Sequence, residues 1–400
     1  MFPGRDLNAL LSARRVLLCV GCGGVGKTTT CAALGLAAAR RGMRALCLTI
    51  DPARRLAQSL GVGQFETRAQ YIAPEVFRDA GMNVSGSLAV MMLDTKTTFD
   101  ELVSTLASSR EKRDRILDNV LYKYISTQLA GTAEYMAMEK LHAVKDDPAF
   151  DVVLLDTPPT SHALDFLDAP ERLVGAMDSA AVRWFLRAFE KPGKLSLNLL
   201  QKSAATVLRG IGRITGGGFL EQVAVFIAEF NELFGGWRQR ADVVRSALRG
   251  PEVGYVLVTT PDPLSIREVL FFAERLREQG MVPDAFVVNR MHMPLARMAA
   301  TETIAQQIAD RGLSLPPDAA PRIVEAALQE HRLSEIDRLH LIALEEAFED
   351  DEGERAPLLV HVPDFPYDIH DVRRLAWVAD VLAPQELSAV SGQLSAGRRA

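Results

Sequence analysis

Near its start the chain has a short apolar run, a glycine-rich segment and a helix-forming run in direct succession. Residues 15–20 read RVLLCV, which is typical of a buried strand, and residues 29–41 are rich in alanine and leucine. Gly42 ends the predicted helix, and residues 45–50 form a second apolar run. Two buried strands joined by a helix predict a right-handed βαβ unit in a parallel sheet.

The glycine-rich segment between the first strand and its helix, Gly21 to Thr28, fits the pattern G-x-x-x-x-G-K-[ST]. Glycines in this pattern let backbone N–H groups turn inward around a phosphate, and the start of the following helix adds positive charge. The lysine then reaches the outer phosphates, and the threonine hydroxyl ligates Mg²⁺. The predicted nucleotide-binding residues are Gly23, Gly24, Val25, Gly26, Lys27, Thr28 and Thr29.

The same segment also fits G-x-G-x-x-G, the dinucleotide-binding pattern, through Gly21, Gly23 and Gly26, with Asp51 as the ribose-binding acid. Two observations favour the phosphate loop. A dinucleotide site has no Lys-Thr pair directly after the last glycine, and a nicotinamide enzyme has no use for the acidic motif at Asp156 described below.

Further apolar runs typical of buried strands recur along the chain, and a polar or turn-forming residue follows each. The runs are 88–93, 152–155, 255–259, 286–288 and 358–362, followed by Asp94, Asp156, Pro261, Asn289 and Pro363. In open α/β sheets, ligands bind at the edge where the strands end. The predicted fold class is α/β, a doubly wound, mostly parallel sheet of the P-loop NTPase type with an inserted α-helical subdomain.

Two long stretches between the predicted strands, about 96–147 and 165–249, have apolar residues at helical spacing. Because strands resume afterwards, we expect these stretches to form a helical subdomain. The predicted domains are a discontinuous P-loop domain (1–95, 148–164 and 250–390), a helical client or partner subdomain (96–147 and 165–249) and a flexible tail (391–400). The acidic run 345–354 is typical of a solvated loop.

Two aspartates at predicted strand ends are candidates for the chemistry. Asp156 lies where an acid beside a phosphate loop holds the water shell of Mg²⁺, the Walker B position. Asp51 precedes Pro52 and has two readings that the residues alone leave equal. It is either a helix N-cap or a carboxylate that orients the attacking water, and both can be true of one residue.

Composition excludes several classes of protein. The chain has 51 acidic and 45 basic side chains, and this net charge of −6 is no broad electrostatic match for nucleic acid. We find no apolar run of membrane-spanning length and no signal-peptide layout at the start. The four cysteines form no secreted disulfide framework. We therefore expect a cytoplasmic protein, which can still dock peripherally on a membrane.

Three segments together resemble the arsenical-pump-driving and tail-anchored-protein-targeting ATPase family. The family loop G-K-G-G-V-G-K-T corresponds to Gly21 to Thr28, its switch I motif D-P-A-H-N/S-L corresponds to residues 51–56 (DPARRL), and its switch II motif D-T-A-P-T-G-H-T-L corresponds to residues 156–164 (DTPPTSHAL). The motifs occur in the family order, with helical insertions between the predicted strands.

The resemblance implies roles for the matching residues, ATP and Mg²⁺ as cofactors, and a dimer. Asp51 would activate water as a catalytic residue beside Lys27, and Thr28 and Asp156 would hold Mg²⁺, Asp156 through water. Asn289 would hydrogen-bond adenine, and Pro363 and Asp364 would lie near the base. The implied switch residues are Asp51, Pro52, Asp156, Thr157 and His162.

The chain also departs from the family pattern. The first loop lysine of the family, which reaches the nucleotide of the partner subunit, is Cys22 here, and a neutral thiol cannot stabilise charge on the γ-phosphate. We hypothesise that the chain hydrolyses ATP slowly as a homodimer or forms a heterodimer with a paralogous ATPase that donates the lysine. Cysteines that the family uses for zinc or arsenite are absent, so arsenite is not expected as a ligand.

Residues 183–213 combine apolar side chains with seven basic residues and one acid. Such a stretch is either an amphipathic helix pair that packs its own core or a groove for a hydrophobic helical client or membrane protein. The predicted function is ATP hydrolysis coupled to rearrangement of the dimer and the helical subdomain. Two alternatives are a weakly hydrolysing regulatory subunit, which Cys22 favours, and a partition-type surface ATPase, which the large helical insertion disfavours.

Overall fold

The computed structural model describes residues 6–50, 60, 67–119, 122–123, 126, 132–157, 175, 233, 236–237, 239–294, 299–349 and 356–384. The chain divides into two compact units. The first contains Met1–Met91, Pro148–Ser161 and Pro251–Ala400, and the second contains Met92–Asp147 and His162–Gly250.

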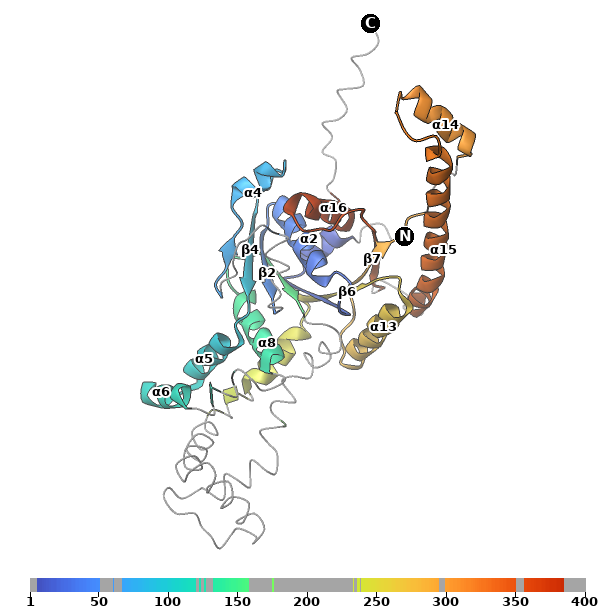
Figure 1. Ribbon diagram of the computed structural model, residues 1–400. Helices are drawn as coiled ribbons and strands as arrows, with labels where there is room; N and C mark the ends of the chain where they lie inside the picture. Colours follow the sequence, from blue (N-terminus) through green and yellow to red (C-terminus); the bar gives the residue numbers. More distant parts are fainter. Residues whose placement is uncertain are drawn as a thin grey trace, which may run out of the picture. The chain divides into compact units, whose positions relative to one another are not determined.

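An eight-stranded sheet of order β3-β4-β2-β5-β1-β6-β7-β8 forms the centre of the first unit in the described residues (Figure 1). The strands are β1 Val16–Gly21, β2 Arg44–Thr49, β3 Gln70–Tyr71, β4 Ser87–Met92, β5 Val152–Asp156, β6 Val253–Thr259, β7 Ala285–Met291 and β8 Leu358–Pro363. The five neighbouring pairs from β2 to β8 are parallel, and β3 pairs antiparallel with β4. The predicted α/β class with a mostly parallel sheet is confirmed.

Helices α2 Lys27–Arg40 and α16 Val372–Leu382 pack together on one face of this sheet, and α13 Pro263–Glu278 lies on the other (Figure 1). The other helices of the first unit are α1 Leu7–Ala13, α4 Pro74–Asp79, α14 Thr301–Asp310 and α15 Ala319–Glu349. Of these, α14 packs on α15. The prediction that residues 345–354 form a solvated loop is wrong in its first part, because α15 continues to Glu349. Buried Leu341 and Leu344 hold the last turns of this helix, which explains why the local acidic charge does not break it.

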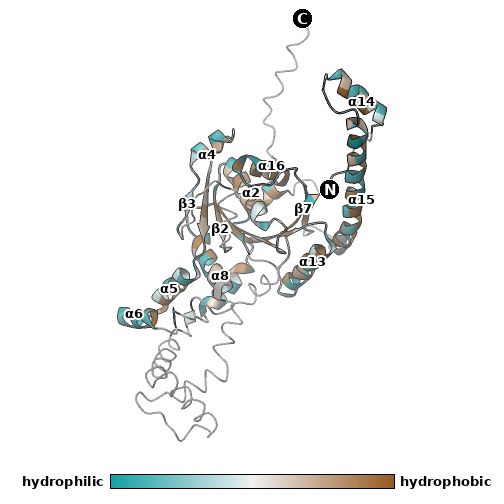
Figure 2. Ribbon diagram, in the orientation of Figure 1, coloured by the Kyte–Doolittle hydropathy of each residue, from teal (hydrophilic) through white to brown (hydrophobic). Residues whose placement is uncertain are grey.

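The core follows from the alternation of side chains along the strands. Every residue of β1, β5 and β6 is buried. Alternate residues such as Leu17, Val256 and Val287 pack in one cluster with side chains of α1, α2 and α16. In Figure 2 the central strands are coloured mainly as hydrophobic, whereas hydrophobic and hydrophilic colours alternate along α15. The central strands are therefore buried on both faces, as parallel strands between helices must be.

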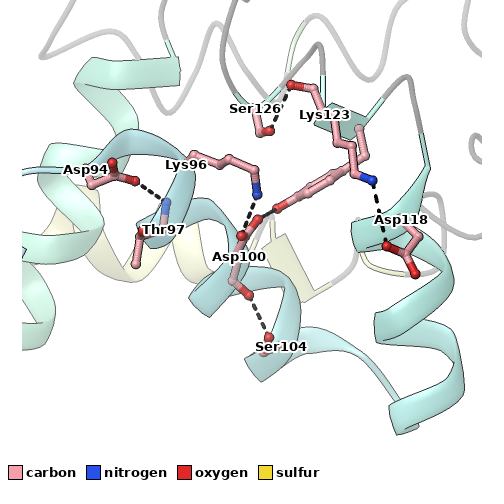
Figure 3. Close-up of polar contacts among 9 residues, drawn as sticks. Asp94, Lys96, Thr97, Asp100, Ser104, Asp118, Lys123 and Ser126 are labelled. Atoms are coloured by element: carbon pink, nitrogen blue, oxygen red, sulfur yellow. Dashed lines mark hydrogen bonds and ion pairs between the residues drawn. The ribbon is translucent and has the colours of Figure 1, made fainter.

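The second unit contains helices in its described part, namely α5 Thr95–Leu106, α6 Arg110–Asp118 and α8 Thr132–Lys145. Trp237 lies in an aromatic cluster with Phe99 and Tyr135, at ring-centroid distances of 5.1 and 5.6 Å. In α5, Asp100 pairs with Lys96 at 2.6 Å (Figure 3). The other carboxylate oxygen of Asp100 accepts a hydrogen bond from the hydroxyl of Tyr122 at 2.5 Å. Burial and the hydrogen bond to Asp100 raise the pKa of Tyr122, so the phenol stays protonated.

Met136 and Met138 of α8 are fully buried, so they are core residues of the second unit. The basic and apolar stretch 183–213, on which the predicted client groove depends, lies outside the described residues. None of the helices in the described part combines the length and the apolar character that crossing a membrane requires.

Candidate functional site

The ends of four neighbouring parallel strands bring the predicted phosphate-binding and metal-binding residues together. In the register of the sheet, Cys19 of β1 lies beside Asp156 of β5, and Gly21 lies beside Val258 of β6. Thr49 at the end of β2 lies on the other side of Asp156. Because parallel strands end at one edge, this segment of the edge carries the loop, the acid and two threonines within a few ångströms.

Glycines in the loop meet two different physical requirements. Gly21 is required by contact, because a Cβ atom there would collide with the carbonyl of Val258. Gly24 and Gly26 have φ values of 81° and 100°, a left-handed backbone that costs other residues strain. Gly26 also faces the side chain of Asn289, which a Cβ atom would strike. The chain enters α2 directly after Gly26, at Lys27 and not at the predicted Thr29, because Gly26 is the N-cap.

The side chain of Lys27 folds back over the phosphate loop, Gly21 to Thr28. Its side chain is buried, and Nζ donates a hydrogen bond to the carbonyl oxygen of Cys22 at 2.7 Å. The ammonium group is therefore held over the inner side of the loop at the start of α2. At this position the lysine charge and the positive end of the helix act on the same point.

Asp156 accepts hydrogen bonds from two threonine hydroxyls. Oγ1 of Thr28 lies 2.8 Å and Oγ1 of Thr49 lies 3.1 Å from Oδ2 of the aspartate. Asp156 is almost completely buried. The described residues contain no cluster of three or more metal-ligating His, Cys, Asp or Glu side chains. One hydroxyl and one carboxylate fit Mg²⁺, which takes few protein ligands and completes its shell with water and phosphate oxygens.

Thr157 has a structural attachment in the described structure. Its hydroxyl donates to the carbonyl oxygen of Cys19 at 2.8 Å, so the chain that leaves β5 is fixed to β1. Asp156 and Thr157 are the part of the predicted switch II segment that the structure describes. The predicted switch and catalytic residues Asp51, Pro52 and His162 lie outside the described residues.

The cysteines near the loop are buried. The thiol of Cys22 faces the N-terminal turn of α13, with Sγ 3.7 Å from the carbonyl oxygen of Ser265. Hydrogen bonds with Cys19 and Cys47, together with burial, raise the pKa of Cys31 well above its ordinary value. A thiol that stays protonated is a poor nucleophile and a poor metal ligand, so Cys31 acts as a core residue.

Asn289 lies against the phosphate loop from the side of β7. Its side-chain amide donates to the carbonyl oxygen of Val25 at 2.8 Å. The pairing of β7 with β8 is interrupted between Val288 and Met291, so Asn289 and Arg290 form a bulge. A bulge redirects side chains, and here it accompanies an asparagine that reaches the loop two strands away.

Pro363 and Asp364 lie at the end of β8, next to this bulge. Pro363 pairs with Met291 in the sheet, and the backbone N–H of Asp364 donates to the carbonyl oxygen of Met291 at 2.9 Å. The two residues predicted to lie near the base are thus adjacent to the chain segment that carries Asn289.

Thr49 is a site residue that the sequence reasoning missed. The sequence pattern assigns it only to an apolar strand, although a hydroxyl near the end of such a strand, two residues before Asp51, is a usable signal. The missing information was the strand order, because β2 follows β1 in sequence but β5 lies between them in the sheet.

Comparison with known proteins finds one protein family and several ATPases that are similar to this chain. The family described as anion-transporting ATPase matches residues 14–307. The ATPase GET3 of Malassezia globosa is 25% identical over 279 residues, which are 70% of this chain and 73% of that protein. The ATPase ASNA1 homolog of Plasmodium vivax is 25% identical over 296 residues, 73% of this chain and 68% of that protein.

A bacterial relative with the provisional name arsenical pump-driving ATPase 1, from Aquifex aeolicus, is 22% identical over 281 residues, 69% of this chain and 63% of that protein. The family match includes the phosphate loop, Asp156 and Asn289, and it covers most of the chain. The chain therefore belongs to the anion-transporting ATPase family and, as predicted, is a P-loop ATPase.

Proposed function

We propose that this chain binds ATP with Mg²⁺ at the loop Gly21 to Thr28 and hydrolyses it as a nucleotide switch. In this proposal the amides of Gly23 to Thr29 and the ammonium group of Lys27 neutralise phosphate charge. Thr28 and, through water, Asp156 hold the metal, which when bound neutralises charge on the phosphate oxygens. Asp51 orients the attacking water, and Asp51, Pro52, Asp156, Thr157 and His162 form the segments that respond to the γ-phosphate.

One observation carries the proposal. The hydroxyl of Thr28 and the carboxylate of Asp156 come from positions 128 residues apart and meet at 2.8 Å beside the loop crossed by Lys27. An all-oxygen donor pair and a buried lysine beside the same loop support this proposal, because a magnesium-bound triphosphate needs both.

The proposal is tested with purified protein by measuring ATP hydrolysis and ATP affinity with and without Mg²⁺. We expect Lys27→Ala to lower both turnover and affinity by about 100-fold or more, because a buried charge over the loop is lost. Lys123→Ala removes a half-exposed lysine of the second unit and is the matched control. Magnesium-independent binding that is unchanged in Lys27→Ala would overturn the proposal.

We further propose a dimer, with a second copy or with a paralogous ATPase, as the working form. Half of the exposed large apolar side chains in the described part of the chain lie between Leu313 and Ile342, on α15 and the segment before it. Such a concentration favours a surface that a protein partner covers. Light scattering with and without ATP tests this proposal, and a monomer under all nucleotide conditions contradicts it.

The proposed client is a hydrophobic helix or a membrane protein, handled by the helical unit in the cytoplasm or at a membrane surface. The family description, anion-transporting ATPase, and the pump-driving name of the Aquifex aeolicus relative support a transport-related role, and residues 183–213 supply the apolar and basic sequence. Retention of a hydrophobic helical peptide by the purified chain tests this, with a charged helical peptide of equal length as control. Equal retention of both peptides would contradict the proposed client.

A second candidate, a weakly hydrolysing regulatory subunit, is favoured by Cys22. The thiol is buried against Ser265 and offers no positive charge to the nucleotide of a partner subunit. Turnover of the wild type, Cys22→Lys and Cys22→Ala separates the candidates. A slow wild type that only the lysine variant accelerates supports the regulatory subunit, and brisk turnover in all three supports the hydrolysing enzyme.

A further inference from the structure

The segment from Asn289 to His292, where β7 ends, has a strained backbone. Arg290 has a φ of 61°, and it is the one residue other than glycine with a positive φ in the part of the chain that the structure describes. A left-handed conformation costs such a residue free energy and persists where the surroundings fix it. Strain of this kind is characteristic of ligand-holding segments, so the contacts that fix the segment are informative.

Two of these contacts lie at the ends of neighbouring strands. Asn289 is fixed to the phosphate loop through its hydrogen bond to Val25. Met291 is fixed to β8 through the N–H of Asp364. Each contact fixes one side of Arg290, and neither involves His292, the residue that follows Met291.

The third contact comes from a helix outside the sheet. Oδ2 of Asp337, on α15, accepts hydrogen bonds from the backbone N–H of His292 at 2.9 Å and from its ring Nδ1 at 2.8 Å. One turn later, Nδ1 of His340 lies 2.9 Å from the carbonyl oxygen of Pro261, just past β6. Helix α15 is thus attached to the ends of two successive strands at the ligand edge.

Asp337 is 6% exposed, and simple helix packing does not explain a carboxylate there. Burying a charged group costs free energy, and an apolar side chain would pack α15 without that cost. Asp337 also binds a single residue twice, through its backbone and its side chain. The contact therefore fixes the position and the rotation of His292 together.

We propose that Asp337 is a positioning residue for the nucleotide base. It holds His292, the second residue after Arg290. Through this short segment it sets the position of the bulge and the direction of the Asn289 amide. An asparagine amide matches the donor and acceptor pattern of adenine, and this pairing depends on its position to within about 1 Å. The inference rests on the proposed function, and Asp337 lies beyond the residues 14–307 that the family match covers.

The test compares the affinities of two ligands that share the phosphate site. MgATP contacts both the loop and the base edge, whereas magnesium tripolyphosphate contacts the loop alone. We expect Asp337→Ala to weaken MgATP by about tenfold and tripolyphosphate by less than about twofold. His292→Ala keeps the backbone bond and has a smaller effect, and Asp337→Asn, which keeps an acceptor oxygen, restores most of the ATP affinity.

Ser334→Ala is the matched control, because this buried hydroxyl of α15 donates to the carbonyl oxygen of His331 in its own helix. A merely structural role of Asp337 would lower both affinities equally and would be shared by the control. The inference is overturned if Asp337→Ala weakens both ligands equally or leaves the affinity for MgATP unchanged. If Asp337→Ala does not fold, His292→Ala decides the question, because it must still weaken MgATP more than tripolyphosphate. A wild type that binds neither ligand overturns the proposed function instead.

Discussion

The proposed phosphate end and the proposed base end of the site are built in different ways. The phosphate end is one continuous segment, Gly21 to Thr28, completed by Asp156 and Thr49. The base end has no comparable segment. It brings together Asn289, the β8 end at Asp364 and, by our inference, Asp337 of α15.

The difference concerns what fixes the backbone. At the phosphate end, glycines adopt the required left-handed turns without cost from a side chain. At the base end, Arg290 adopts a similar conformation against its preference and is held by contacts from three other elements. Changes at the phosphate end should therefore affect every phosphate ligand, whereas changes at the base end should affect only ligands that carry a base.

The largest effect is expected for Gly26→Ala. The new Cβ atom meets both a φ of 100° and the side chain of Asn289, so the loop must move. We expect affinity for MgATP and tripolyphosphate to fall by about 100-fold, with about 1–3 kcal/mol lost from the free energy of unfolding. Gly24→Ala is the control, because its φ is 81° but no atom lies within 4 Å. Similar losses in both variants would mean that strain alone matters.

Asp156→Asn tests whether the phosphate end depends on the metal. Loss of the carboxylate charge should lower turnover by about 100-fold and raise the Mg²⁺ concentration needed for half-maximal rate. Thr49→Val removes one hydroxyl from the same carboxylate and should have a smaller effect in the same direction. Steady-state rates over a Mg²⁺ series provide the measurement. An unchanged Mg²⁺ dependence in Asp156→Asn would contradict the assigned role.

Asn289→Ala tests the opposite end of the comparison. Removal of the amide should weaken MgATP by about tenfold and leave tripolyphosphate within about twofold. Calorimetric titration of both ligands into one protein preparation gives the ratio. If tripolyphosphate weakens as much as ATP, the contact of Asn289 with Val25 supports the loop itself, and the two ends are not independent.

The smallest effect is expected at the opposite ends of the strands, where β2 and β5 begin. Asp151, just before β5, accepts hydrogen bonds from the side chain and backbone of Arg44, which lower its pKa from 3.8 to about 2. A carboxyl group whose pKa is lowered by folding stabilises the folded protein at pH values above its ordinary pKa. This contribution is lost as the pH falls toward 2. Asp151→Asn should cost less than about 1 kcal/mol at pH 7, because the pair is partly exposed.

The free energies of unfolding of this variant and the wild type, measured with denaturant, should converge as the pH falls from 5 to 2. Nucleotide affinity should be unchanged, because no residue of the phosphate or base end contacts Asp151 in the described structure. A constant stability difference across this pH range would contradict the role given to the Arg44 pair.

Much of the phosphate end could be predicted because its information is local. The strand, the loop and the helix are consecutive, and Lys27 and Thr28 follow directly from the glycine pattern. Asp156 was predictable as a second motif because it ends an apolar strand. Thr49 was not, since the order of β2, β5 and β1 in the sheet is a long-range property that short patterns do not contain.

The base end was predicted only in part. Asn289, Pro363 and Asp364 were named by resemblance to a family, whereas the bulge at Arg290 and the contact of His292 with Asp337 have no local signal. Strand β3 was also missed, because two residues are too few for a periodic pattern and its place depends on pairing with β4.

The sequence by itself determined the ATPase family, the α/β class and the phosphate loop, because backbone conformation near glycine and the burial of apolar runs are set by neighbouring residues. The tertiary structure alone decided which distant side chains meet the loop. Hydrogen bonds such as that from His292 to Asp337 depend on how helices and strands pack, and packing joins residues whose distance along the chain carries no signal.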